Sequence, residues 1–216
     1  MKQVGIVDFG MSNLFSVQTA FKKLGIATFT SSSFKDLATA DALVLPGVGA
    51  FELAAAQLTK LKLTNFLQDW ISNNNSFLGI CLGMQLLFEK SEEFGQHSGL
   101  GIFEGSVKSF KTTFESKGLS GRIPCVGWNN ITKKSQSWLG SAFDCLNPDK
   151  SDVYFVHSYF CEPKNNEIIL AEAEYSNFVY CAAIRQKNLT ALQFHPEKSG
   201  EVGLTMLQNW IKQENF

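Results

Sequence analysis

The segment Phe77-Leu-Gly-Ile-Cys-Leu-Gly-Met-Gln85 joins a short apolar run directly to a helical pattern. Residues 77–81 predict a buried strand, and the pattern that follows predicts a helix through residue 88. Cys81 stands at the junction, in the form G-x-C-x-G. This is the arrangement of a nucleophile elbow, in which a tight turn presents a reactive side chain at the edge of a sheet. The alternative is a buried structural cysteine between two packing glycines.

Strands and helices alternate on both sides of this segment in the N-terminal half. Strands are predicted at residues 3–9, 26–30 and 41–45, the last of them broken by Pro46 and Gly47. Helices are predicted at residues 13–24, 50–58 and 65–74, where apolar residues recur at helical spacing. Such alternation predicts an α/β fold with a mainly parallel sheet flanked by helices.

The pattern changes after residue 101. Further strands are predicted at residues 101–110, 127–132, 153–162, 168–175, 179–186 and 189–194. No long amphipathic helix separates them before residues 202–212, and residues 111–122 are expected to form a surface loop. We therefore predict an additional antiparallel sheet in the C-terminal half, within a single domain of residues 1–216.

Composition excludes several classes of protein. Of the 216 residues, 44% are hydrophobic and 18% are charged, which is typical of a globular chain and not of a disordered one. Lys and Arg total 19 against 20 Asp and Glu, so there is no basic footprint for nucleic acid. No apolar run approaches the ~18 residues of a membrane span, and no signal peptide is evident. The five cysteines lack metal-ligand spacing, which favours free thiols, a cytoplasmic protein and no metal site.

A cysteine nucleophile needs a base, and the base needs a group that orients it. His195 ends an apolar strand in the sequence Ala191-Leu-Gln-Phe-His-Pro-Glu197. In extended conformation His195 and Glu197 would point to the same side, so that the carboxylate could stabilise the imidazolium. The alternative is an ordinary His-Pro-Glu surface turn.

Acyl transfer also needs donors for a developing oxyanion. The backbone N–H of Leu82, directly after Cys81, is one candidate. The turn formed by Gly47, Val48 and Gly49 follows a predicted strand end, and its glycines permit unusual peptide orientations. An ordinary strand-to-helix turn is the alternative for this segment.

Together these segments resemble the class I, triad-type glutamine amidotransferases, and in particular the glutaminase subunits of imidazole glycerol phosphate synthases. The matching blocks span the chain. They are Asp8-Phe-Gly-Met-Ser-Asn-Leu14, Pro46-Gly-Val-Gly-Ala-Phe51, Gly79-Ile-Cys-Leu-Gly-Met-Gln85, Tyr154-Phe-Val-His-Ser-Tyr159 and Gln193-Phe-His-Pro-Glu-Lys-Ser199. The resemblance implies a flavodoxin-like α/β fold.

The resemblance also implies an activity. Cys81 would attack the side-chain amide of glutamine, His195 would act as base, Glu197 would orient it, and ammonia would leave. The residues implied to bind the substrate are Gln85, Glu93, His157, Ser158 and Tyr159. Among these, Glu93 has the charge to recognise an α-ammonium group. No cofactor or metal is expected.

In the family, ammonia passes to a cyclase partner, a β/α barrel, in a heterodimer of the histidine pathway. The resemblance implies that Asn13, Trp128 and Asn129 lie at the interface with this partner. Cys125 and Val126 replace the usual His and Met there, and Ser12 replaces a glycine.

These departures leave the acceptor of the ammonia open. A paralogous glutaminase could feed a related barrel enzyme that aminates another acceptor, such as a nucleotide sugar. The elbow and the histidine would by themselves also permit a stand-alone cysteine hydrolase. A non-catalytic binding subunit is the third hypothesis, and the intact Cys81, His195 and Glu197 argue against it.

Overall fold

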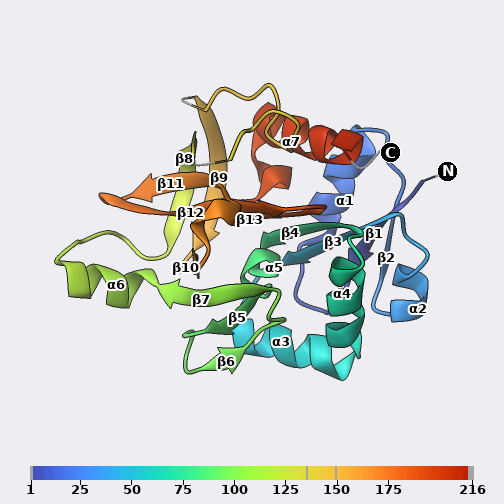
Figure 1. The fold of residues 1–216 in the computed structure, drawn as a ribbon, viewed down its shortest axis with the longest axis horizontal. Coiled ribbons are helices and arrows are strands. Elements are labelled where there is room, and N and C mark those ends of the chain that lie inside the picture. Colours follow the sequence, from blue (N-terminus) through green and yellow to red (C-terminus); the bar gives the residue numbers. More distant parts are fainter. Residues whose placement is uncertain (1, 135, 149, 214–216) are drawn as a thin grey trace.

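The computed structural model describes residues 2–134, 136–148 and 150–213 (Figure 1). The strands are β1 (Val4–Val7), β2 (Thr28–Ser31), β3 (Ala42–Gly47), β4 (Ser76–Cys81), β5 (Phe88–Ser91), β6 (His97–Ser98), β7 (Phe103–Ser109), β8 (Cys125–Lys133), β9 (Ser151–His157), β10 (Tyr159–Pro163), β11 (Ile169–Tyr175), β12 (Phe178–Gln186) and β13 (Leu189–Leu192). The helices are α1 (Leu14–Lys23), α2 (Phe34–Leu37), α3 (Phe51–Lys60), α4 (Leu63–Ser72), α5 (Leu82–Gln85), α6 (Phe110–Lys117) and α7 (Gly200–Gln213), with short 3-10 helices η1 (Asn166–Ile168) and η2 (Pro196–Lys198).

The parallel part of the sheet is built as predicted. β2, β1, β3, β4 and β13 lie side by side in this order, and every neighbouring pair is parallel. In Figure 1, α1 and α7 cover one side of these strands, and α3 and α4 cover the other. The sheet has a hydrophobic core on each of its two faces, and alternate residues of β3 point into them. Val44 packs with α1 and α7 on one face, whereas Leu43 and Leu45 pack with α3 and α4 on the other. β1, β3, β4 and β13 are therefore buried on both faces, whereas the edge strand β2 is partly exposed.

The antiparallel strands continue the same sheet. β13 pairs antiparallel with β12, which pairs with β10 and β11, and β8 and β9 extend this branch. Over the described ranges the parallel and antiparallel parts thus form one hydrogen-bonded sheet of 13 strands. The predicted strand at residues 153–162 is two strands, β9 and β10, divided at Ser158.

Some predicted boundaries were wrong. The segment expected to be a surface loop contains α6, which buries Phe110 and Phe114 and is capped by the side chain of Ser109. The helix expected to reach residue 88 ends at Gln85, since residues 86 and 87 form a turn and β5 begins at Phe88. The apolar residues read as the end of this helix are instead buried in the turn and the strand. Pro46 does not end β3, which remains in register with β4 through Gly47.

The fold brings the predicted site together at one edge. β4 and β13 are parallel neighbours, so their carboxyl ends lie side by side. Cys81 is the last residue of β4, and His195 comes shortly after β13. Over the described ranges, no helix is long and apolar enough to cross a membrane.

Candidate active site

The turn at Cys81 has the geometry of a nucleophile elbow. Cys81 is the last residue of β4 and adopts φ 53° and ψ −109°, a strained backbone conformation for a non-glycine residue. Packing excludes a side chain at Gly83 and leaves little room for one at Gly79. A Cβ on Gly83 would lie 1.8 Å from the carbonyl oxygen of Leu45, and one on Gly79 would lie 3.1 Å from the carbonyl oxygen of Gly83. The G-x-C-x-G pattern therefore reflects a tight strand-to-helix turn that aims the Cys81 side chain away from the sheet.

His195 and Glu197 form a buried pair. Nδ1 of His195 lies 2.8 Å from Oε1 of Glu197, and the two side chains are 2% and 1% exposed. The sequence suggested that His195 and Glu197 meet through an extended segment, and this prediction was wrong. Instead Pro196 starts the 3-10 helix η2, whose turn brings Glu197 back beside the ring.

The charge on this pair depends on its surroundings. Burial lowers the pKa of His195, but the neighbouring Cys81 and the Glu197 carboxylate outweigh burial and raise that pKa to about 10. The imidazole is therefore held in its protonated form. Its Nε2 atom is buried and has no hydrogen-bond partner of ordinary geometry among the described residues. The ring nitrogen on the Cys81 side is thus available for a reacting group.

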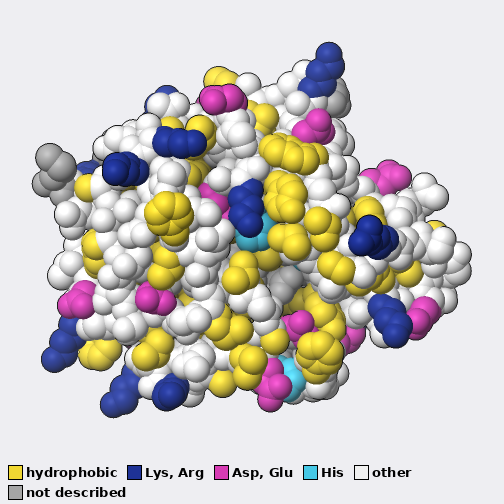
Figure 2. All heavy atoms as spheres, turned by 180° about the vertical axis from the view of Figure 1, so that it is seen from behind, with side chains coloured by type: hydrophobic (Ala, Val, Ile, Leu, Met, Phe, Trp, Pro, Cys, Tyr) yellow, Lys and Arg dark blue, Asp and Glu magenta, His cyan; other side chains and the backbone are white. Residues whose placement is uncertain are grey.

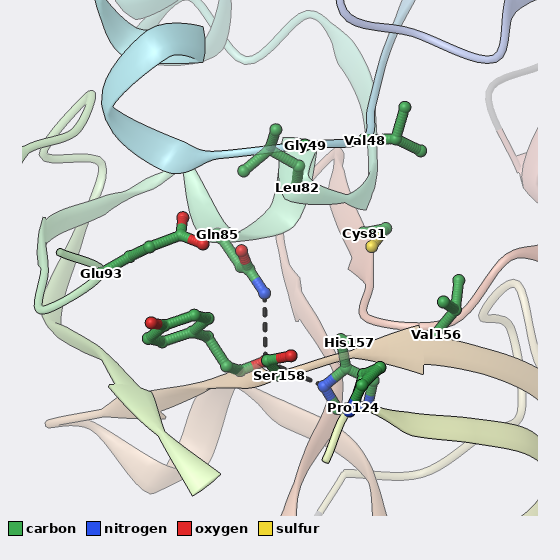
Figure 3. A pocket seen from close by; sticks show the side chains of 11 residues that line it. Val48, Gly49, Cys81, Leu82, Gln85, Glu93, Pro124, Val156, His157 and Ser158 are labelled. Carbon is green, nitrogen blue, oxygen red and sulfur yellow. Dashed lines mark hydrogen bonds between the residues drawn. The ribbon is translucent and has the colours of Figure 1, made fainter. Parts of the chain in front are cut away.

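A cavity of about 290 Å³ opens in front of Cys81 (Figure 3). It is lined by Val48, Gly49, Cys81, Leu82, Gln85, Glu93, Pro124, Val156, His157, Ser158 and Tyr159. Every residue predicted to bind the substrate is in this set. His195 and Glu197 are outside it, and His195 reaches the site through its contact with Cys81. Gly47 does not line the cavity either, since it pairs with Cys81 in the β3–β4 ladder.

The side of the cavity formed by Gln85, His157 and Glu93 is held by hydrogen bonds to the backbone. Nε2 of Gln85 donates to the carbonyl oxygen of Tyr159 at 3.1 Å, and Nδ1 of His157 donates to the same oxygen at 2.8 Å, as the dashed lines in Figure 3 show. Burial lowers the pKa of His157 to about 4, with a smaller contribution from His195, so this ring is neutral. Oε2 of Glu93 accepts from the backbone N–H of Phe51 at 2.6 Å and so caps α3.

The predicted oxyanion segment is in a conformation that withholds one donor. The N–H of Val48 donates to the carbonyl oxygen of Met11 at 2.9 Å and is not free for a ligand. Gly49 has φ +104°, and a Cβ there would lie 2.8 Å from the Met11 side chain. Oγ of Ser12 donates to the carbonyl oxygen of Pro46 at 3.0 Å. The loop after β1 therefore holds this segment in place.

The predicted interface residues lie on β8 and directly before α1, and none of them is among the residues that line the cavity. Trp128 on β8 is 58% exposed and Val126 is 56% exposed, whereas Cys125 is buried. The replacement at residue 125 is therefore a change in the interior, and only the one at residue 126 alters the surface. Figure 2 shows hydrophobic side chains gathered near the centre of one face, beside a histidine and a basic side chain.

Asn13 and Asn129 are less exposed than Trp128. Asn13 directly precedes α1, and the second residue of this helix, Phe15, is 79% exposed. Asn129 donates through Nδ2 to the carbonyl oxygen of Glu174 at 2.6 Å. Among the described residues, no group of three or more acidic, histidine or cysteine side chains could hold a metal ion.

One polar residue was not singled out from the sequence. Gln193 follows β13, is fully buried and donates through Nε2 to Sγ of Cys81 at 3.7 Å. Its position two residues before His195, at the end of an apolar strand, was the feature that could have identified it.

A family model described as glutamine amidotransferase class-I matches residues 5–213 of this chain. Curated relatives are similar over nearly the whole length. The imidazole glycerol phosphate synthase subunit HisH 1 of Legionella pneumophila (strain Lens) is 41% identical, covering 98% of this chain and 100% of that protein. The imidazole glycerol phosphate synthase subunit HisH of Chlorobium luteolum is 42% identical, covering 97% and 99%, and that of Bacillus subtilis (strain 168) is 40% identical, covering 97% and 95%.

Solved structures share the fold at low sequence identity. A glutamine amidotransferase crystal structure has a TM-score of 0.73 at 16% identity, covering 99% of both chains. The PurLQS structure from Thermotoga maritima has a TM-score of 0.73 at 15% identity, covering 98% of both chains. At this identity the likeness concerns the fold alone.

Proposed function

The chain belongs to the class-I glutamine amidotransferase family, and we propose from this premise that it is the glutaminase subunit of an imidazole glycerol phosphate synthase in histidine biosynthesis. Relatives that carry this subunit name are 40–42% identical to the chain over at least 95% of its length. One observation supports this chemistry above all: Cys81 lines a cavity, and the buried His195–Glu197 pair lies beside it.

The first half of the reaction forms a thioester. The thiolate of Cys81 attacks the side-chain carbonyl carbon of glutamine, and the carbonyl oxygen becomes an oxyanion. When the tetrahedral intermediate collapses, the C–N bond breaks and the protonated His195 gives its Nε2 proton to the departing nitrogen. Ammonia leaves, and a glutamyl thioester remains on Cys81. The raised pKa of His195 ensures that this proton is present at neutral pH.

The second half restores the enzyme. The neutral His195 takes a proton from water, and the hydroxide attacks the thioester carbon. The C–S bond breaks, glutamate leaves, and the thiolate and imidazolium are regenerated. Throughout, Glu197 holds Nδ1 of His195, which keeps Nε2 directed at the reacting atoms and stabilises the imidazolium.

We assign the α-amino end of glutamine to Glu93 and Gln85. Both side chains line the cavity opposite Cys81 (Figure 3). Glu93 provides an anionic group for the α-ammonium. Because both N–H groups of Gln85 are used by protein acceptors, its Oε1 is the atom left to accept from the substrate.

The oxyanion donors are the N–H of Leu82 and one N–H of the Gly47–Gly49 turn. In the present conformation the N–H of Val48 is bonded to Met11, so a peptide rotation would have to free this N–H before it could serve as an oxyanion donor. Such control suits a subunit whose product is ammonia, since uncontrolled hydrolysis would release ammonia into solvent.

The partner in this proposal is a β/α-barrel cyclase in a heterodimer. Large exposed apolar side chains are typical of contact surfaces. Such side chains on β8 and at the start of α1 support an interface there, namely Trp128, Val126 and Phe15. That the protein acts in the cytoplasm stays a prediction.

The test is a coupled assay with the purified chain and a purified barrel cyclase from the histidine pathway. We expect slow glutamine hydrolysis by the chain alone, and strong stimulation when the cyclase and its nucleotide substrate are added. Cys81→Ala should abolish glutamate release but leave synthesis from added ammonium salt intact.

Different results would assign a different function. Full hydrolysis by the isolated chain, unchanged by any partner, would favour the stand-alone hydrolase. Stimulation only by a barrel enzyme that aminates another acceptor would favour the paralogous glutaminase.

A further inference from the structure

Gln193 has no part in the mechanism above, although its side chain contacts the nucleophile. It follows β13, and its backbone N–H donates to the carbonyl oxygen of Ala182 at 2.8 Å, which fixes its main chain. The side chain is fully buried, and Nε2 lies 3.7 Å from Sγ of Cys81. Buried polar groups are normally hydrogen-bonded, and the partner of this amide is the sulfur of the proposed nucleophile.

The direction of this amide is determined by a chain of hydrogen bonds that starts at the backbone. The carbonyl oxygen of Tyr159 can only accept, so the Gln85 atom bonded to it is the nitrogen Nε2. The same nitrogen lies 3.1 Å from the Gln193 side chain, whose oxygen Oε1 must therefore accept. Nε2 of Gln193 is left to face Cys81. The sulfur thus receives an N–H donor and not an amide oxygen.

A donor at this position favours the charged form of the sulfur. A thiolate accepts hydrogen bonds strongly, whereas a neutral thiol is a weak acceptor. Hydrogen bonds to an ionised group contribute more than bonds between neutral groups, and the difference grows in a buried site. Gln193 is therefore placed to stabilise the nucleophile before substrate attack.

We propose that Gln193 is a positioning residue with two contacts. Its Nε2 stabilises the Cys81 thiolate, and its Oε1 holds the Gln85 side chain so that Oε1 of Gln85 is directed toward the substrate. One side chain thereby connects the nucleophile to the group that recognises the amino end of glutamine. The inference rests on the proposed glutaminase function for its second half, but the first half concerns Cys81 alone.

The charged groups around Cys81 make a pH measurement interpretable. His195 and Glu197 lie beside it as an ion pair, from the segment after β13. Cys161 on β10 stays a neutral thiol, because burial raises its pKa well above the usual range. His157 on β9 stays a neutral imidazole, because burial lowers its pKa to about 4. Glu93 faces the same cavity from the far side.

Two variants separate the two contacts. Gln193→Met has similar length and removes both the donor and the acceptor. Gln193→Glu keeps an acceptor for Gln85 but removes the N–H donor to Cys81. Gln208→Met is the matched control, because Gln208 is exposed on α7.

The first measurement is the rate at which iodoacetamide alkylates Cys81, followed by peptide mapping between about pH 5 and pH 10. It needs no glutamine turnover, and mapping separates Cys81 from the exposed Cys145. We expect the midpoint of the alkylation profile to rise by about one to two pH units in Gln193→Met, from the loss of one hydrogen bond to an ionised group. In Gln193→Glu it should rise at least as far, because a negatively charged carboxylate replaces the donor beside the sulfur. Gln208→Met should leave the profile unchanged.

The second measurement is the steady-state kinetics of glutamine hydrolysis. We expect kcat to fall about 10- to 100-fold in both Gln193 variants. KM should rise in Gln193→Met but remain near the wild-type value in Gln193→Glu, since only the first variant frees Gln85. Thermal unfolding of each variant establishes that the protein is folded.

An alkylation profile that is unchanged in a folded Gln193 variant would overturn the proposal. If the methionine variant does not fold, the glutamate variant still tests the donor to Cys81. If the wild-type chain hydrolyses no glutamine under any condition, the proposed function fails, while the alkylation profiles still decide the role of Gln193 at Cys81.

Discussion

The carbonyl oxygen of Met11 accepts a hydrogen bond from the backbone N–H of Val48 at 2.9 Å. This bond joins the loop after β1 to the turn that borders the cavity at Cys81. Asn13 and the exposed Phe15 follow Met11 closely in the sequence, so a contact made by a partner with these residues would act on Val48 through a short covalent path. The geometry therefore offers a physical route by which partner binding could free an oxyanion donor.

Ser12→Ala should raise the activity of the chain without a partner. Its hydroxyl donates to the carbonyl oxygen of Pro46 at 3.0 Å, and losing this bond weakens the hold on the turn by about 0.5–1.5 kcal/mol. That corresponds to about a 2- to 13-fold larger population of rotated peptides. The measurement is basal glutaminase kcat, with Ser116→Ala on α6 as control, because the Ser116 hydroxyl also donates to a backbone carbonyl oxygen, that of Thr113. A basal rate equal to that of the wild type would show that the Ser12 bond does not restrain the turn.

Gly49→Val should abolish stimulated turnover while leaving Cys81 open to labelling. The residue has φ +104°, which a β-branched side chain rarely adopts, and a Cβ would lie 2.8 Å from the Met11 side chain. Loss of one oxyanion donor costs roughly 10²- to 10³-fold in other hydrolases. Covalent labelling of Cys81 by an electrophilic glutamine analogue reports whether the cavity is intact. Partner stimulation at the wild-type level in this variant would contradict a switching role for the turn.

Glu197→Gln tests the origin of the His195 charge. Loss of the carboxylate removes one of the two groups that hold the pKa of His195 at about 10, so this pKa should fall. The alkaline limb of the kcat profile should therefore move to lower pH, and kcat should fall about 10²- to 10⁴-fold. A loss as complete as that of Cys81→Ala would mean that Glu197 does more than orient the ring.

The same residue predicts a dependence of stability on pH. A group whose folded pKa exceeds its unfolded value stabilises the fold fully below the unfolded value, about 6.5 for histidine, and loses this contribution as pH rises through the folded pKa. The wild-type free energy of unfolding should therefore contain a component that declines between about pH 6.5 and pH 10. This component should be smaller in Glu197→Gln, as measured by denaturant titration at several pH values.

Gly83→Ala should destabilise the protein, because the added Cβ would lie 1.8 Å from the carbonyl oxygen of Leu45. Backbone must move to relieve this contact, and we expect a loss of about 3 kcal/mol and a fall in Tm of about 6–12 °C. Gly118→Ala is the control: it adds a Cβ at positive φ but meets nothing within 4 Å. If both variants lost the same stability, close packing at the elbow would not be the reason for the glycine.

The sequence predicted the parallel sheet well, because buried strands and amphipathic helices have local patterns. It located Cys81 and His195 because both lie at ends of such strands. It did not predict how Glu197 reaches His195, since the turn of η2 depends on packing of Ser199 and α7. The sequence also did not predict the hydrogen bond from the N–H of Val48 to the carbonyl oxygen of Met11, because a bond between two backbone groups does not depend on which side chains are present.

Errors in the antiparallel half have a similar physical cause. α6 is a short helix with little amphipathic pattern, and it is ordered mainly by two phenylalanines that pack against distant strands. Phe110 contacts Phe160, Tyr175, Phe178 and Tyr180, all far along the chain. Such long-range packing overrides local propensity and cannot be inferred from a short window of sequence.

Glu93 accepts a hydrogen bond at the start of α3 and also lines the cavity, and substitution can separate its structural role from the role in substrate binding that we propose. Its Oε2 accepts from the N–H of Phe51 at 2.6 Å, at the start of α3, where Ala50 provides no side-chain cap. It also faces the cavity, where we assign it to the α-ammonium of glutamine. Glu93→Gln keeps an oxygen for the cap but removes the charge. Glu93→Ala removes both.

We expect KM for glutamine to rise about 10- to 100-fold in both Glu93 variants, because each loses a charge-assisted contact to the substrate. Only Glu93→Ala should also lose stability, by about 1 kcal/mol from the missing helix cap, which lowers Tm by about 2–4 °C. Steady-state kinetics and thermal unfolding measure the two effects independently. An unchanged KM in Glu93→Gln would remove Glu93 from substrate recognition and leave it as a cap for α3, and the α-ammonium would then have to be bound through the oxygen of Gln85.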